Sequence, residues 1–208
     1  MSYDVPKEIQ DLAKTMNNFS YSNGLDISQV FDDFLVYIIS FFTPVVKPIV
    51  EWKYSPEQNA VFHTMLIEWV KIMEKQIYLK QWYDAFGDLY MGLIAGSSRT
   101  SGRGQFFTPP EICDLMTSAM GDKDIIGKYV SDPTCGSGRT LLSWHVQHLG
   151  NYLCAEDIDR TCCMMTVCNM LIHGCEGEVI WHNSLEPDSF LGGWKVNYSS
   201  FGFRNQAV

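Results

Sequence analysis

The chain has 208 residues, of which 46% are hydrophobic, and it carries 15 basic and 24 acidic side chains for a net charge of −9. This composition excludes a disordered tail and a small disulfide-rich module, because there is enough apolar material to bury a core. The longest nearly unbroken apolar run, residues 34–46, is shorter than the roughly 20 residues that a membrane helix needs. We therefore expect no membrane-spanning segment.

The charge has the wrong sign for a protein that grips a phosphate backbone unaided. Both parts of the chain are acidic, with 9 basic and 12 acidic residues before Gly104 and 6 and 12 after it. The N-terminus lacks the pattern of a secretory signal, and seven cysteines without paired spacing fit a reducing compartment. We predict a cytoplasmic protein with reduced thiols, which needs a partner if nucleic acid is its substrate.

In the first hundred residues the pattern is helical, with predicted helices over 26–42 and 56–86. Ser55 followed by Pro56 is a helix-start signal. The longer helix carries an apolar stripe at three- and four-residue steps, which we interpret as core packing: Phe62, Leu66, Trp69, Met73 and Ile77. The glycine-rich segment 96–104 marks a boundary, so we predict an all-helical domain over 1–103 and a second domain over 104–208.

In the second domain, short apolar strands alternate with helices. The predicted strands are 125–130, 152–155 and 179–181, and the predicted helices include 141–145 and 160–173. Strand–helix–strand–helix–strand is typical of a parallel sheet with crossover helices, which indicates an α/β fold.

A glycine turn between the first strand and its helix indicates a ligand site. Gly136 and Gly138 let the backbone approach a ligand closely, and Asp157 follows Gly136 by 21 positions, at the end of the second strand. A carboxylate at about that spacing binds ribose hydroxyls in dinucleotide folds. The dinucleotide-binding motif requires a third glycine at the position of Leu141, so the absence of that glycine makes NAD the less favoured ligand.

Two longer motifs carry a family resemblance. The Asp-Pro-Thr-Cys-Gly-Ser-Gly-Arg-Thr-Leu-Leu segment at 132–142 and the Gly-Gln-Phe-Phe-Thr-Pro segment at 104–109 resemble N6-adenine DNA methyltransferases, especially the modification subunits of type I restriction-modification systems. The segments 155–159, 169–174 and 182–185 are similar to further elements of that family. The resemblance implies a Rossmann-like sheet that binds S-adenosylmethionine, behind a helical N-terminal domain.

The resemblance also implies roles for individual residues. An aromatic at 106 or 107 would lie against the cofactor, Thr108 would bind its carboxylate, and Asp157, with Glu156 as the alternative, would bind its ribose. Asn183 stands where the family has an aspartate beside the adenine. The implied cofactor-binding set is Phe106, Phe107, Thr108, Asp132, Pro133, Gly136, Gly138, Asp157 and Asn183.

The chain departs from this family at the base-holding motif, Asn-Pro-Pro followed by Tyr or Phe, which it lacks. In the expected place stand Asn197 and Tyr198, our candidate catalytic residues, and the chain ends ten residues after Tyr198. We therefore expect an incomplete sheet and limited activity of the chain alone on a flipped adenine. The alternative is a catalytically impaired cofactor-binding or assembly subunit of a larger complex, with DNA, a specificity subunit or a second copy as partners. A nicotinamide oxidoreductase has only fold analogy behind it.

Other chemically reactive side chains have simpler interpretations. Cysteines 162, 163, 168 and 175 with His173 lack the short paired spacings of zinc sites, so we predict no metal. His145 and His148 are expected to be a polar surface pair, and Cys135 a small loop filler. Arg99 and Arg103 fit either a phosphate contact or an ordinary solvated loop.

Overall fold

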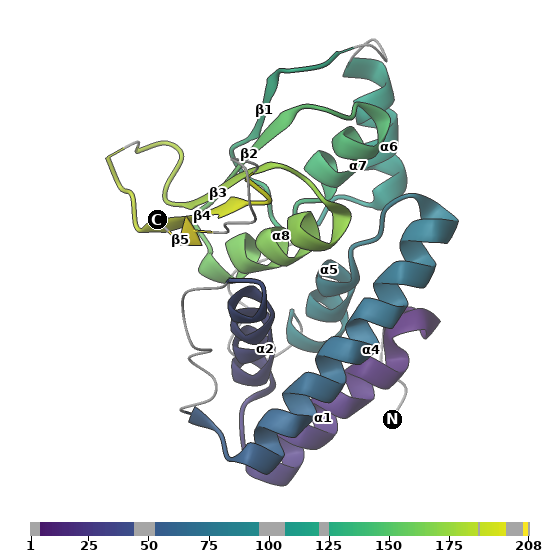
Figure 1. Ribbon diagram of the computed structural model, residues 1–208, viewed down its shortest axis with the longest axis vertical. Coiled ribbons are helices and arrows are strands. Elements are labelled where there is room, and N and C mark those ends of the chain that lie inside the picture. The colour runs from purple at the N-terminus through teal and green to yellow at the C-terminus, as the bar shows by residue number, and fades with distance from the viewer. Residues whose placement is uncertain are drawn as a thin grey trace. The chain divides into compact units, whose positions relative to one another are not determined.

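The computed structural model describes residues 5–43, 53–95, 107–120, 125–186, 188–198 and 206–207 (Figure 1). The chain divides into two compact units, residues 1–106 and 107–208. The predicted boundary after residue 103, with Arg99 and Arg103, lies outside the described residues and stays a prediction. In the described part of the chain, no helix is both long enough and apolar enough to cross a membrane.

All regular structure described in the first unit is helical. Its elements are η1 (Lys7–Ile9), α1 (Gln10–Asn23), α2 (Ile27–Phe41), α4 (Pro56–Lys80), α5 (Ala85–Leu89) and the π-helix η2 (Tyr90–Ile94). The helix predicted over 26–42 is confirmed as α2. Ser55 begins α4 as predicted: its hydroxyl oxygen accepts a bond from the backbone N–H of Gln58, and its own backbone N–H donates to the side-chain oxygen of Gln58.

Helix α4 ends earlier than the sequence pattern predicts. It stops at Lys80 because Gln81 takes φ 70°, outside the helical region. The apolar stripe does form core, since Phe62, Trp69 and Met73 are fully buried in α4. The ring of Phe62 contacts other aromatic rings, among them that of Phe19 at 5.2 Å between centroids, so the aromatic residues of this unit pack on one another.

The second unit contains helices beside a five-stranded sheet in the order β1-β2-β3-β4-β5. The elements are α6 (Pro110–Met120), β1 (Tyr129–Asp132), α7 (Arg139–Gln147), β2 (Tyr152–Asp157), α8 (Arg160–His173), β3 (Gly177–Trp181), β4 (Gly192–Val196) and β5 (Gln206–Ala207). Strands β1, β2 and β3 are parallel, which confirms the predicted strand–helix alternation. Because both crossovers step in the same direction across the sheet, right-handed connections place α7 and α8 on one face.

The last two strands make the sheet mixed, which the sequence pattern did not predict. Strand β4 pairs with β3 in the antiparallel sense, and β5 pairs antiparallel with β4. Only residues 182–191 join β3 to β4. A parallel return needs a crossover of a dozen or more residues, so this connection allows only the antiparallel pairing.

Strand β1 begins four residues later than predicted, because residues 125–128 are held as a loop. The side chain of Asn151 accepts the amide of Lys128 at 2.9 Å and donates to the carbonyl of Ile125 at 2.8 Å. Gly127, at φ 71°, donates its amide to the carbonyl of Gly150. The later start shortens β1 at its amino end, and Asp132 remains the last residue of the strand.

Candidate functional site

The carboxyl ends of the three parallel strands meet at one edge of the sheet. Asp132 ends β1, Asp157 ends β2 and Trp181 ends β3. The loops that follow these strands carry most of the residues that the sequence singles out. In open α/β sheets, ligands bind outside this carboxyl edge, and we take this edge as the candidate site.

The turn between β1 and α7 requires glycine at two positions. Gly136 has φ 57° and Gly138 has φ 88°, values that other residues rarely adopt. A Cβ on Gly136 would lie 2.9 Å from the ring of Phe107, and a Cβ on Gly138 would lie 3.0 Å from the methyl group of Thr166. Both glycines are therefore needed by the protein's own packing, apart from any ligand.

Asp157 ties the end of β2 to this glycine turn. Its Oδ2 atom accepts the amide of Gly136 at 2.9 Å, and its Oδ1 atom accepts the amide of Asp159 at 2.8 Å. The neighbouring Glu156 instead contacts His182, with 2.9 Å between Oε2 and Nε2. Because a carboxylate offers about four acceptor positions, the carboxylate of Asp157 keeps capacity for a ligand's hydroxyl groups.

The edge is negatively charged. Burial raises the pKa of both Asp132 and Asp157, and the charges of Asp159 and Asp132 raise the pKa of Asp157 further, while the bonds from backbone amides oppose the rise. Within the described residues, neither carboxylate is paired with a basic side chain. Such an edge suits a ligand that brings positive charge and hydroxyl donors.

The loop after β3 packs on the loop after β1. The hydroxyl of Ser184 donates to the carbonyl of Pro133 at 2.6 Å. Within that loop, Asn183 accepts the amide of Leu185 on its Oδ1 atom and donates its own amide to the hydroxyl of Ser189. The structure thus brings Asn183 and Pro133 to the same edge as Asp132.

The segment before α6 reaches the same turn. The ring of Phe107 lies against Gly136 and 5.8 Å from the guanidinium carbon of Arg139. Arg139 donates to the carbonyl of Thr108 at 3.4 Å. Phe107 and Thr108 therefore join the predicted set in space, whereas Phe106 lies outside the described residues.

The two predicted catalytic residues do not join this set. They follow β4, which runs antiparallel to β3, so Val196 pairs with Gly177 at the amino end of the parallel strands. The side-chain amide of Asn197 donates to the carbonyls of Met170 and Cys175, both at 3.0 Å, at the end of α8. The structure therefore gives Asn197 a place at the opposite edge, where it caps a helix, and it places Tyr198 beside it.

Sequence reasoning missed two contacts that hold the turn, both from α8. Thr166 and Asn169 are fully buried and donate to carbonyls of Gly136 and Ser137. The signal in the sequence is a pair of polar residues three positions apart in a helix whose other buried positions are apolar or cysteine. Asn169 begins the segment 169–174, which resembles the family, but the resemblance did not assign it a function.

The cysteines near the turn are unreactive in this environment. Cys135, Cys162 and Cys163 are buried, and the loss of solvent raises the pKa of each thiol. All seven cysteines are free thiols, and no group of three potential metal ligands is found among the described residues.

The predicted histidine surface pair is wrong. Helix α7 ends at Gln147, and His148, the residue after it, leaves the helical conformation at φ −139°. The side chain of His148 is buried, and its ring lies 4.3 Å from that of Trp144 between centroids.

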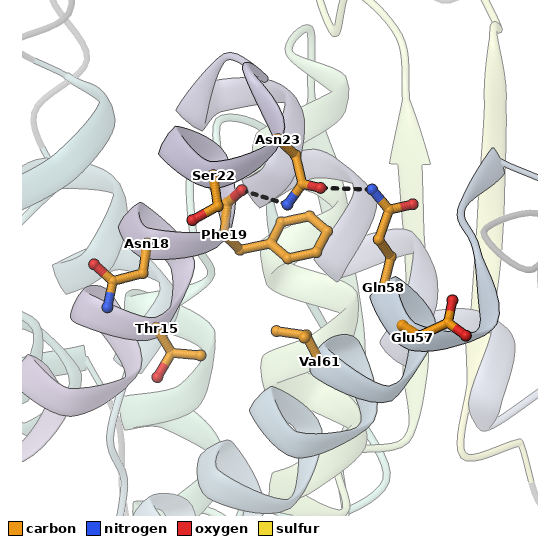
Figure 2. A pocket seen from close by; sticks show the side chains of 8 residues that line it. All are labelled: Thr15, Asn18, Phe19, Ser22, Asn23, Glu57, Gln58 and Val61. Carbon is orange, nitrogen blue, oxygen red and sulfur yellow. Dashed lines mark hydrogen bonds between the residues drawn. The ribbon is translucent and has the colours of Figure 1, made fainter.

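A separate groove of about 400 Å³ lies in the helical unit, between α1 and the start of α4 (Figure 2). Its walls are mostly neutral polar side chains, and Gln58 donates to the side-chain oxygen of Asn23 at 2.7 Å. None of the predicted site residues lines it. The chemistry of the chain therefore points to the sheet edge and not to this groove.

The fold defines an α/β class of protein, and a glycine turn, two acids and an aromatic side chain at the carboxyl edge make this edge the candidate ligand site. Comparison with known sequences is more specific. The N-6 DNA methylase family matches residues 81–198, more than half of the chain. The chain belongs to that family. The match begins at the end of α4, so it includes the last helices of the first unit.

Individual relatives agree with this assignment. The chain is 32% identical over 120 residues to a type I restriction enzyme MpnII methylase subunit of Mycoplasma pneumoniae, covering 53% of this chain and 22% of that protein. It is 27% identical over 119 residues to the MjaIX methylase subunit of Methanocaldococcus jannaschii, covering 52% and 20%. The chain thus spans about a fifth of the length of these relatives.

Among solved structures, the chain is similar to the methyltransferase subunit of a type I restriction-modification system from Streptococcus thermophilus. The two share 22% sequence identity with a TM-score of 0.38, over 84% of this chain and 38% of that one.

The buried carboxylate of Asp132 at the end of β1 gives a prediction about stability. Because burial raises the pKa of Asp132, the ionised group destabilises the fold, and this cost appears as pH rises through the raised pKa. Asp132→Asn should therefore raise the free energy of unfolding at pH 7. The advantage should vanish in urea unfolding below about pH 3, where the carboxyl is protonated in both states. An advantage that does not depend on pH would contradict this account.

The position of Asn197 gives a second prediction. Asn197→Ala removes the bonds to the carbonyls of Met170, Leu171 and Cys175 and places alanine at φ 50°, so it should lower the free energy of unfolding by about 1–3 kcal/mol. The matched control is Asn18→Ala, an exposed asparagine on α1, which should change it by less than about 0.5 kcal/mol. Equal values for the two variants in urea unfolding would refute the capping role.

Proposed function

We propose that the second unit is a Rossmann-like S-adenosylmethionine-binding domain and that the protein works in N6-adenine methylation of DNA. The observation that carries the proposal is the bond from Gly136 to Asp157, which joins a glycine turn to an acid at the carboxyl edge. The adjacent order of β1, β2 and β3 fits one half of a nucleotide-binding sheet. Membership of the N-6 DNA methylase family supports the choice of cofactor.

The residues at the edge fit this cofactor. The carboxylates of Asp132 and Asp157 complement its positive charges and its ribose hydroxyls, and the two glycines keep the turn free of Cβ atoms. Phe107 offers an aromatic face, which favours a cation such as a sulfonium. When bound, S-adenosylmethionine supplies a methyl group on that sulfonium.

The chain's own part in the reaction is to bind and orient the donor. We assign Asp157 to the ribose, Asp132 and Pro133 to the region of the amino group, Thr108 to the carboxylate and Asn183 to the adenine. Phe106, which lies outside the described residues, stays the alternative to Phe107. We extend no base-holding role to Asn197 or Tyr198, because Asn197 caps α8 at the other edge.

The adenine-holding function then belongs to a partner or to further polypeptide, as does most of the contact with DNA. A net charge of −9 supports this division, and the relatives that match are named as subunits. The second candidate function is therefore a cofactor-binding or assembly subunit, with a specificity subunit or a second copy of the chain as the partner. The cytoplasmic location stays a prediction.

Cofactor binding by the purified chain tests the first step. Calorimetry should show heat with S-adenosylmethionine and none with NAD. Asp157→Ala should weaken binding by more than about 1 kcal/mol, because a bond to a charged group is lost. Glu156→Ala is the matched control, since that neighbouring acid contacts His182, and it should bind nearly as well as the wild type. A larger loss at Glu156 would mean that the ribose ligand is misassigned, and heat with neither cofactor would overturn the proposal.

Methyl transfer separates the two candidate functions. We expect the chain alone to bind the cofactor and to incorporate little labelled methyl into DNA, and we expect incorporation to rise when a type I specificity subunit is added. As a control, the Asp157→Ala variant in the same mixture should lower incorporation if the methyl donor is bound by this chain. Robust incorporation by the chain alone would instead favour an autonomous enzyme.

A further inference from the structure

Helix α8 turns two buried polar side chains toward the glycine turn. The hydroxyl of Thr166 donates to the carbonyl of Gly136 at 2.9 Å, and the amide of Asn169 donates to the carbonyl of Ser137, also at 2.9 Å. Both side chains are fully buried. They lie three positions apart, so they share one face of the helix.

These contacts are unusual uses of helical residues. A threonine inside a helix ordinarily bonds the carbonyl four positions before it, and a buried asparagine costs free energy unless its polar atoms are bonded. The other buried positions in α8 are apolar or cysteine, at Cys162 to Met165, Val167, Cys168 and Met170. The helix therefore buries polar groups only where it faces the turn.

Together with Asp157, these side chains hold successive peptide groups of the turn. Asp157 accepts the amide of Gly136, and Thr166 binds the carbonyl of the following peptide. The next carbonyl, that of Ser137, accepts a hydrogen bond from the side-chain amide of Asn169. The backbone N–H of Gly138 donates to the carbonyl of Cys135 at 2.8 Å, which closes the turn. Three peptide planes are thus fixed from outside the turn.

Fixing a carbonyl also fixes the amide in the same plane. A trans peptide directs its N–H opposite to its C=O, and the described peptides include no cis bond. Since the carbonyl of Gly136 points to α8, the N–H of Ser137 points away from α8. The methyl group of Thr166 lies 3.0 Å from the place where a Cβ of Gly138 would stand, so position 138 has room only for glycine.

We propose that Thr166 and Asn169 are positioning residues for the methyl donor. They act through the turn, by holding its peptide groups in the orientation that the donor meets, and this lowers the ordering cost of binding. The proposal rests on the proposed function, since it assumes that S-adenosylmethionine binds at this turn.

Two substitutions at one position separate the hydroxyl from the methyl group. Thr166→Val keeps the shape and removes the donor, whereas Thr166→Ser keeps the donor and removes the methyl. By calorimetry on the full chain with S-adenosylmethionine, Thr166→Val should raise the Kd about five- to tenfold, and Thr166→Ser should stay within about twofold of wild type. Asn169→Leu, which removes the other donor at similar volume, should also raise the Kd.

The matched control is Val167→Ala, the next residue on the same helix and also buried. It should lower the unfolding midpoint while the Kd stays unchanged at a temperature where all variants are folded. Hydrogen exchange of the unliganded chain gives a readout that does not depend on the donor. The amides of residues 136–138 should exchange faster in Thr166→Val than in Val167→Ala.

The outcomes are distinct. Wild-type affinity and unchanged exchange in Thr166→Val would overturn the positioning role, as would losses of affinity that follow stability alone across all four variants. Absence of donor binding by the wild type would overturn the proposed function, and with it the donor-positioning role. Faster exchange in Thr166→Val would then show only that α8 orders the turn. Weak binding and fast exchange confined to the variants that lose a donor to the turn would support the proposal.

Discussion

The bond between the amide of Gly136 and the carboxylate of Asp157 joins the ends of two parallel strands. It connects the turn after β1 to β2, and the bond from Ser184 to Pro133 adds the loop after β3. Strand pairing alone would leave these loops independent of one another. With these bonds, the glycine turn becomes a fixed element, and the geometry of the carboxyl edge depends on it.

The sequence predicted the elements that obey a strong local rule. The helix over 160–173 and the parallel strands around it follow from the alternation of apolar strands and helices, and Ser55 with Pro56 is an unambiguous helix start. The glycine turn and Asp157 were predicted from spacing, and the structure brings them together. The N-6 DNA methylase family was predicted from the motifs and is confirmed by the family match.

The parts that the sequence did not reveal depend on contacts between distant residues. Gln81 ends α4 through a single positive φ within a run that is otherwise helical. The placement of Asn197 follows from the antiparallel pairing of β4, which a motif comparison does not contain. The roles of Thr166 and Asn169 exist only because α8 packs on a turn some 30 residues earlier in the chain, at Gly136 and Ser137. Spacing therefore identified the residues at the carboxyl edge better than the residues that support them.

We propose that this turn and Asp157 hold a methyl-donating nucleoside. A crystal structure of the chain soaked with S-adenosylmethionine tests it most directly. The account predicts electron density for the donor over residues 136–138, with a ribose hydroxyl in hydrogen-bond contact with Asp157. Density at another place, or a ring of Phe107 that still covers Gly136 and leaves the donor no room, would contradict it.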